Sequence, residues 1–218
     1  MRSQFKVDNV SIGRRAIRNV LLDYLTAFKN DEGEIKSSAE LAYAHFEDSN
    51  CMTDKMAGLS SLVSLSGNKI ADELRGKALA KFFKDAEGDA LVLDKWFAVQ
   101  AMSDVKNALG EVRGLLEHEE FSFKNPNRCR SLVSVFAANT GGFHNLDGSG
   151  YEFIGEMVVK MDGLNPQISA RLVGSLVGWK KFDERRGLKM QKELLKILND
   201  LGDEISHDLF EVVTKSLR

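Results

Sequence analysis

The chain has 218 residues, of which 43% are hydrophobic and 28% charged, and its formal net charge is −2 at pH 7. This composition excludes intrinsic disorder, because it supplies enough apolar side chains for a core. The balance of acidic and basic residues lacks the basic excess of a nucleic-acid-binding protein, so we expect no nucleic-acid partner. Only two prolines occur in the whole sequence. A sandwich or barrel with many turns would use more, so the composition favours helices.

Apolar residues recur at the three- and four-residue spacing of amphipathic helices along most of the chain. The stripes lie in residues 17–28, 70–82, 105–116, 154–161, 168–179, 190–201 and 205–213. Strand-like alternation is not sustained anywhere in the sequence. The pattern predicts an all-α protein of about ten or eleven helices, each three to five turns long and joined by short connections.

Polar residues at the breaks between stripes can accept a hydrogen bond from the free amides at a helix N-terminus. The candidate caps are Ser11, Thr53, Ser103, Asn125, Asn165 and Asp203. Asn125-Pro126 and Asn165-Pro166 form a pair, each with proline at the favoured first helical position. They lie 40 residues apart, close to the period of roughly 40–47 residues in HEAT and armadillo repeats. We therefore expect a superhelix of antiparallel helix pairs, whose concave face commonly binds a ligand or partner.

The two cysteines, Cys51 and Cys129, belong to no CxxC pair. We interpret them as buried free thiols in a reducing compartment, with a single disulfide as the alternative. No apolar stretch reaches the ~18 residues that a membrane helix needs, and the first residues lack the apolar core of a signal peptide. We therefore expect a cytoplasmic protein without a membrane partner. The helical pattern is under way by Ser11, which fits a domain cut from a longer chain as well as a natural beginning.

A self-sufficient active site is not apparent. The nearest approach to the zinc-peptidase pattern HExxH is the run 118–122, where Ser122 stands in place of the second histidine, and we interpret this run as a surface helix end. The other histidines, His45, His144 and His207, are scattered and suggest no common ligand set. Nucleophile elbows, Walker loops and dinucleotide fingerprints are also missing. We expect no catalytic residue, metal or cofactor in this chain.

Residues 145–156 have the spacing of a calcium-binding loop. Positions 1, 3, 5, 6 and 12 of such a loop would be filled by Asn145, Asp147, Ser149, Gly150 and Glu156. Against this, the first ligand is Asn rather than Asp, and Glu152 takes the eighth position, where an apolar residue is expected. We interpret the segment as a Gly-rich turn that caps a helix starting near Tyr151. A calcium-responsive module is the alternative.

The two Asn-Pro helix starts carry the better binding candidates. Arg128 and Arg130 belong to the first start, and Gln167 and Arg171 belong to the second. The helix dipole disfavours arginine early in a helix, so each arginine there invites a reason. A guanidinium that binds a carboxylate of a ligand is one common reason. The alternative, which these residues alone favour, is an ion pair with one of the chain's own acids.

Five short runs follow one another in order through most of the chain. They are Leu93-Asp94-Lys95-Trp96-Phe97, Asn125-Pro126-Asn127-Arg128, Phe143-His144, Asp147-Gly148-Ser149-Gly150-Tyr151 and Asn165-Pro166-Gln167. Together they resemble the C-terminal domain of the aminopeptidase N family, in its bacterial-type alanyl aminopeptidase branch. The resemblance extends from about Val10 to Leu217, and the order and spacing of several motifs make it specific.

The resemblance implies a zinc metallopeptidase that removes single amino acids from peptide N-termini, using a metal-bound water and a glutamate base. In the family the zinc site lies in a central catalytic domain. The resemblance therefore implies that this chain lacks the zinc site and is inactive by itself. Residues 1–10 would be a linker from the preceding domain, and residues 11–218 the C-terminal superhelix. The implied partner is the catalytic domain of the same polypeptide.

In the family this domain closes over the catalytic domain, encloses a cavity and limits access to unfolded or short peptides. By motif matching, Gln167 would reach toward the pocket for the first substrate side chain. Arg130 and Arg171 would face the cavity, available to the carboxylate or carbonyls of a bound peptide substrate, whereas Arg128 would be structural. The alternative function is a free-standing helical-repeat module that binds protein partners.

Overall fold

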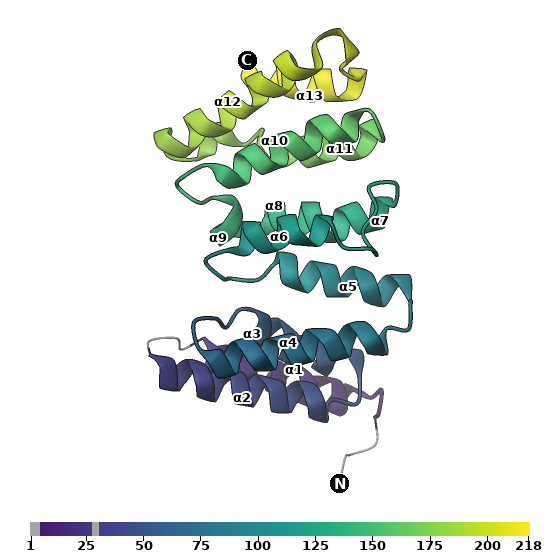
Figure 1. The fold of residues 1–218 in the computed structure, drawn as a ribbon, viewed down its shortest axis with the longest axis vertical. Helices are drawn as coiled ribbons and strands as arrows, with labels where there is room; N and C mark the ends of the chain where they lie inside the picture. The colour runs from purple at the N-terminus through teal and green to yellow at the C-terminus, as the bar shows by residue number, and fades with distance from the viewer. Residues whose placement is uncertain (1–4, 28–30) are drawn as a thin grey trace. The chain divides into compact units, whose positions relative to one another are not determined.

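Every regular element in the described residues, 5–27 and 31–218, is a helix in the computed structural model (Figure 1). The all-α prediction is therefore confirmed for this part of the chain. Contacts within the chain divide it into two compact units, unit 1 (Met1–Val105) and unit 2 (Lys106–Arg218). Each unit has a hydrophobic core of its own.

Unit 1 is built from helices that pack on one another in a small bundle. Their bounds are α1 (Asn9–Thr26), α2 (Glu32–Asp48), α3 (Met52–Val63), α4 (Lys69–Asp85) and α5 (Ala90–Ala101). α1 packs on α2 and α3, α2 packs on α3 and α4, and α5 packs on α3 and α4. The core includes the fully buried Phe46, Leu59, Leu62 and Phe97. Gly58 allows α3 to approach α2 closely, because a Cβ at this position would lie 2.7 Å from the backbone nitrogen of Phe46.

Unit 2 consists of shorter helices followed by two helix pairs. The bounds are α6 (Ala108–Leu116), α7 (Pro126–Cys129), α8 (Val135–Ala138), α9 (Thr140–Phe143), α10 (Ser149–Asp162), α11 (Pro166–Leu172), α12 (Glu184–Leu201) and α13 (His207–Leu217). A π-helical turn, Arg130–Ser134, joins α7 to α8, and 3-10 turns occupy Val173–Ser175, Trp179–Lys181 and Gly202–Glu204. Phe136, Phe143, Tyr151 and Phe153 are among the fully buried core residues.

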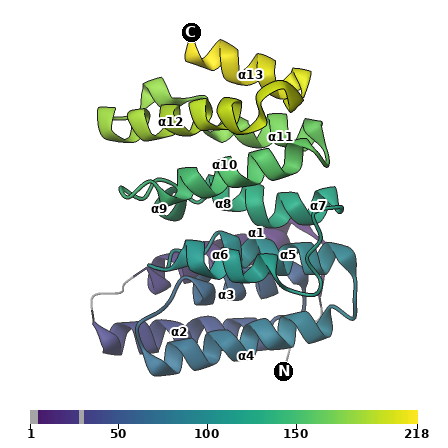
Figure 2. The same ribbon diagram turned by 45° about the horizontal axis from the view of Figure 1, so that its top comes forward.

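The pairs in unit 2 pack as expected for armadillo-type repeats. α10 and α13 each pack against both α11 and α12, so the pairs α10–α11 and α12–α13 lie one on the other in chain order (Figure 2). The predicted 40-residue spacing continues, because the N-cap of α13 is Ser206, 41 residues after Asn165. The buried Asp162 fixes this third start by accepting hydrogen bonds from the amide and hydroxyl of Ser206, at 2.8 and 2.6 Å.

The predicted number of helices agrees with the structure. If α7, the π-turn and α8 are taken as one continuous helix, the described residues contain eleven helices longer than four residues. Two of them, α6 with nine residues and α11 with seven, are shorter than the expected three turns. The period of 3.6 residues per turn makes them about two to two and a half turns long.

The predicted helix caps are right only in part. Asn125 and Asn165 cap α7 and α11 through their side chains. At the other starts the N-cap residues are Asp8, Cys51, Asn107 and Ser206, in place of Ser11, Thr53, Ser103 and Asp203. At the first start the carboxylate of Asp8 accepts the amide of Ser11 at 2.9 Å, so α1 begins at Asn9, within the expected linker. Residues 1–4 of that linker lie outside the described residues.

The apolar stripe of α1 is not part of a core. Ile17, Val20, Leu21, Tyr24 and Leu25 are between 53 and 72% exposed. Phe28, the last predicted member of the stripe, lies outside the described residues. The helical periodicity is therefore right, but this side of the helix faces solvent.

Both cysteines are free thiols in the structure. Cys129 is buried, as predicted, whereas Cys51 is partly exposed. Burial raises the pKa of the Cys129 thiol to about 11, so this thiol is neutral and unreactive at physiological pH. Within residues 5–27 and 31–218, the helices are too short or too polar to span a bilayer.

Candidate functional site

The first Asn-Pro start is organised by hydrogen bonds to its own backbone. The Asn125 side chain accepts the amides of Asn127 and Arg128 at 3.0 and 3.2 Å. Arg128 is only 3% exposed, and its Nη1 donates to the carbonyl of Glu120 at 2.8 Å. Arg128 therefore anchors the preceding loop to the start of the helix, which agrees with the structural role expected of it.

Arg130 lies in a different environment two residues later. Its side chain is exposed, and its Nη1 lies 3.4 Å from the side-chain oxygen of Asn127. It is also the first residue of the π-helical turn Arg130–Ser134. Such turns are rare and are frequent at functional sites, because the extra residue changes which side chains face outward. Leu132 and Val133 of the same turn are buried, while Arg130 faces solvent.

The second start presents two polar side chains on one face of α11. The Asn165 side chain accepts the amide of Ile168 at 3.2 Å. The buried Ser169 hydroxyl donates to the carbonyl of Val158 at 2.8 Å, and this bond ties α11 to α10. Gln167 and Arg171 are both exposed. They are four residues apart, so they are neighbours on the helix surface.

The ion-pair alternative for these arginines does not hold. Within the described ranges, neither Arg130 nor Arg171 forms an ion pair with an acid. The side chain of Gln167 makes no hydrogen bond with an acid there either. In both Figure 1 and Figure 2, α7 and α11 begin at the same edge of unit 2. The helix starts that carry the three residues therefore lie at the same edge of unit 2, and the only hydrogen bond that the two guanidinium groups make in the described ranges is the exposed one from Arg130 to Asn127.

Within the segment 145–156, residues 145–148 form a turn that leads into α10, which begins at Ser149. The Asp147 carboxylate accepts the amide and hydroxyl of Ser149 at 2.8 and 2.7 Å, and these bonds lower the pKa of Asp147. Gly148 adopts the left-handed conformation, with φ +86°. The ammonium of Lys189 donates to the carbonyl oxygens of Leu146, at 2.9 Å, and of Asp147. A side-chain cation therefore already occupies the backbone oxygens of this loop, which supports its interpretation as a helix cap.

The histidines and acids of the described ranges do not assemble into a metal site. No group of three or more His, Cys, Asp or Glu in this part of the chain could hold a metal ion. In the HExxH-like run, the ring nitrogen Nδ1 of His118 accepts the amide of Glu120 at 3.1 Å, so one imidazole nitrogen is used in a local turn. The residues present do not fit a bound zinc ion.

A buried acid in unit 2 was missed by the sequence reasoning. Glu193 on α12 is 3% exposed, and its Oε2 has no hydrogen-bond partner. Lys196 Nζ lies 3.9 Å from this oxygen, and burial raises the pKa of Glu193 above its usual 4.5. A signal was available, because Glu193 falls three residues after Met190 and four before Ile197, within the predicted apolar stripe of that helix.

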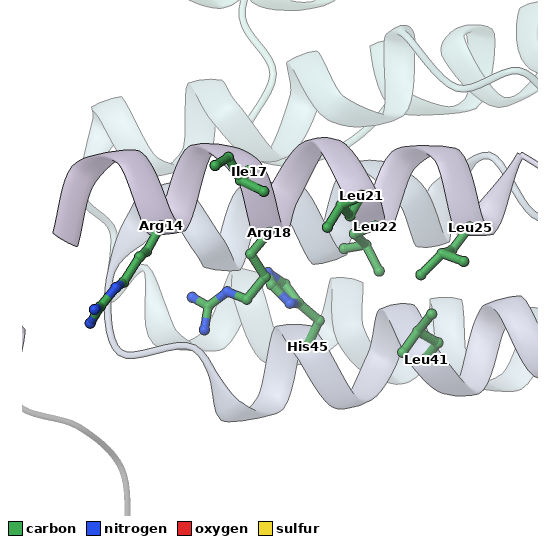
Figure 3. A pocket seen from close by; sticks show the side chains of 8 residues that line it. All are labelled: Arg14, Ile17, Arg18, Leu21, Leu22, Leu25, Leu41 and His45. Atoms are coloured by element: carbon green, nitrogen blue, oxygen red, sulfur yellow. The ribbon is translucent and has the colours of Figure 1, made fainter. Parts of the chain in front are cut away.

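An open groove in unit 1 was also missed, because helical periodicity gives the apolar stripe of α1 but not which helix lies beside it. It lies between α1 and α2, with a volume of about 490 Å³. Its apolar walls are formed by Ile17, Leu21, Leu22, Leu25 and Leu41. Figure 3 shows Leu22 and Leu25 of α1 facing Leu41 of α2 at one end of the groove, with Arg14, Arg18 and His45 toward the opposite end.

Comparisons with known proteins agree with this architecture. All 218 residues match a family described as a domain of unknown function (DUF3458_C) with ARM repeats. Proteins named aminopeptidase N from Escherichia coli K12 and Haemophilus influenzae are 38% and 36% identical to it over 99% of this chain. The chain spans only 23% of the length of either relative.

A solved structure gives the same fold. The crystal structure of Legionella pneumophila aminopeptidase A in complex with aspartic acid superposes with a TM-score of 0.85, at 24% sequence identity. The match covers 99% of this chain and 25% of that one. At this identity the likeness shows the fold alone.

Proposed function

We propose that this chain is the non-catalytic C-terminal part of a larger aminopeptidase. The chain belongs to the family of ARM-repeat domains described as DUF3458_C. The observation that carries the proposal is identity of 36–38% along essentially the whole chain to proteins named aminopeptidase N. These relatives are several times longer, so most of such an enzyme lies outside these residues. The catalytic domain of the same polypeptide would be the partner of this chain.

The parent enzyme would depend on zinc, and its zinc would be held outside this chain. This assignment is supported by the chemistry of the described residues, which offer no group of three ligands and already engage His118 in a turn. The isolated chain would therefore not hydrolyse peptides. Its two free thiols favour a reducing compartment, so we place the parent enzyme in the cytoplasm.

The role of the chain in the parent would be to enclose the substrate cavity and to bind peptide substrates through Gln167, Arg171 and Arg130. Three features support this: the side chains are exposed, the two guanidinium groups have no acidic partner in the described ranges, and Arg130 begins a π-turn. A guanidinium can bind a carboxylate or carbonyl of a peptide, and the Gln167 amide can both donate and accept. Arg128 is buried and donates to the carbonyl of Glu120, so its guanidinium is not available to a peptide.

The test is substitution in the full-length parent. Gln167→Ala should alter the preference among the first residues of the substrate and leave the zinc content unchanged. Arg171→Ala should lower kcat/KM for peptides about tenfold or more, because a charged hydrogen bond contributes roughly 1.5–3 kcal/mol. Arg185→Ala is the matched control, since Arg185 is an exposed arginine of unit 2 on another helix.

Equal losses on every substrate for Gln167→Ala, with a lowered melting temperature, would mean that Gln167 only supports the fold. If the Arg171→Ala enzyme keeps full activity, Arg171 is not part of the proposed site. Loss of activity in the Arg185→Ala control would show that the assay responds to the folding stability of unit 2 rather than to substrate contact.

A further inference from the structure

The two Asn-Pro helix starts carry a side-chain amide at the same position. Asn127 and Gln167 are each the second residue after the capping asparagine of their helix, and both side chains are exposed. α7 and α11 begin at the same edge of unit 2 in Figure 1 and in Figure 2. Asn127 is therefore the counterpart, one repeat earlier, of a residue already assigned to peptide binding.

A guanidinium accompanies the amide at each of these starts. Arg130 follows Asn127 by three residues and Arg171 follows Gln167 by four, and residues at these spacings are neighbours on a helix surface. In the first pair, Arg130 Nη1 donates to Asn127 Oδ1 at 3.4 Å. Among the described residues, the amide nitrogen Nδ2 of Asn127 has no acceptor. The first pair therefore keeps amide donors that a ligand could use.

The third start of the array has no such pair. Ser206 caps α13, and the position that corresponds to Asn127 is occupied by Asp208. The position that corresponds to Arg130 is occupied by Glu211, whose carboxylate is paired with Lys215 of the same helix. An ionised carboxylate can only accept hydrogen bonds, so it cannot bind a peptide carbonyl. The amide–guanidinium pair thus distinguishes the first two starts from the third.

The first start is held in place without the side chain of Asn127. Arg128 donates to the carbonyl of Glu120 at 2.8 Å, and the thiol of the buried Cys129 donates to the carbonyl of Phe123 at 3.4 Å. Asn127 adds only one long and exposed side-chain hydrogen bond, so its contribution to folding stability is small. The backbone around Asn127 is fixed, as a binding residue requires, while its side chain is not needed for the fold.

We propose that Asn127 is a further peptide-binding residue, whose Oδ1 orients the guanidinium of Arg130 and whose Nδ2 donates to a main-chain carbonyl of the peptide. The inference rests on the proposed function, because it adds a residue to the same binding edge. Packed helices lie roughly 8–10 Å apart and an extended peptide advances ~3.3 Å per residue, so one repeat corresponds to about two or three peptide residues. Asn127 therefore binds beyond the residue that Gln167 contacts, and it favours peptides over substrates with a single amino acid.

The test is steady-state kinetics of the full-length parent on a tetrapeptide and on a single amino acid linked to a chromogenic amine. Asn127→Ala should raise KM for the tetrapeptide about fivefold and leave kcat unchanged, because one neutral hydrogen bond of ground-state binding is lost. Both constants for the single-residue substrate should stay within about twofold, because it has no carbonyl at that distance. Asn199→Ala is the matched control, since Asn199 is an exposed asparagine of α12, and it should leave both substrates unaffected.

Two further variants separate binding from a role in the helix start. Asn127→Gln keeps the amide and should hold KM for the tetrapeptide within about twofold of the unsubstituted enzyme. Asn127→Asp keeps an acceptor for Arg130 but loses the donor, so it should behave like Asn127→Ala. A merely structural role predicts the opposite order, because a negative charge is favoured in the first turn of a helix. In the 218-residue chain, all three variants should melt within about 2 °C of the original.

The outcomes distinguish this inference from the proposed function. If Asn127→Ala leaves the tetrapeptide KM unchanged, or Asn127→Asp restores it, the inference is refuted, and a changed first-residue preference in Gln167→Ala would still support the function. An equal rise in KM for the single-residue substrate, or in the Asn199→Ala control, would also overturn it. If Gln167→Ala and Arg171→Ala have no effect either, the proposed binding edge fails together with the inference.

Discussion

Glu193→Gln should stabilise the chain at neutral and alkaline pH and have no effect in acid. The Glu193 carboxyl is buried on α12, and a Cβ on Gly155 of α10 would lie only 2.9 Å from its Oε2, so there is little room for water. Burial raises the pKa in the folded state above the usual 4.5. The attraction of Lys196, at 3.9 Å and half exposed, offsets only part of this cost, because solvent screens it.

The sign follows from the two protonation states. Below pH 4.5 the carboxyl is protonated in both the folded and the unfolded chain, so the substitution changes little. As the pH rises toward and through the raised folded-state pKa, the unfolded chain loses its proton first, and the folded chain must then bury a charge. Each unit of pKa difference lowers the stability by about 1.4 kcal/mol. We therefore expect Glu193→Gln to gain about 1–3 kcal/mol at pH 8, the usual cost of an unsatisfied buried group.

The assay is urea unfolding of the chain and the variant at several pH values from 4 to 8. Glu119→Gln is the control, because Glu119 is exposed, and its curve should follow that of the unsubstituted chain. A stability difference for Glu193→Gln that does not change with pH would refute the reasoning. A less stable variant at pH 8 would show that the ion pair with Lys196 outweighs burial.

Five further substitutions, at four positions, test the packing and the helix starts. Gly58→Ala should cost about 1–3 kcal/mol, because the new Cβ would overlap the backbone of α2; an unchanged melting temperature would contradict the close approach. Asn165→Ala should cost about 0.5–2 kcal/mol for the lost cap, and Asn165→Asp should retain most of it; equal losses for both would argue against capping. Arg128→Ala should cost roughly 1.5–3 kcal/mol for the lost charged hydrogen bond, whereas Arg130→Ala should stay within about 0.5 kcal/mol. Equal losses for the two arginines, in the same urea assay, would contradict the division between a buried anchor and an exposed ligand-binding side chain.

Local signals in the sequence predicted local structure well. Asn125 and Asn165 cap their helices, because the Asn side chain and the following proline act within three residues of each other. The third start, at Ser206, has no proline, so the repeat could be recognised only once the spacing was seen in the structure. At the start of α1 two acceptors compete, and the carboxylate of Asp8 takes the position expected for Ser11.

Features that depend on the rest of the fold could not be predicted in the same way. Periodicity found the apolar stripe of α1, but it cannot tell whether a neighbouring helix covers that stripe. The π-turn that begins at Arg130 has no recognisable sequence signal, since it reflects how the whole helix packs. Whether Arg130 and Arg171 pair with acids also depends on distant elements, and the residues alone favoured the wrong answer.

As proposed above, this chain is one part of a larger aminopeptidase. The most direct test is an immunoblot of source extract with an antibody against the chain, together with an aminopeptidase assay on the immunoprecipitate. We expect a band several times heavier than the chain and a peptidase activity that a zinc chelator abolishes. A band at the size of the chain itself, with no activity in the precipitate, would contradict the claim and favour a free-standing helical-repeat module.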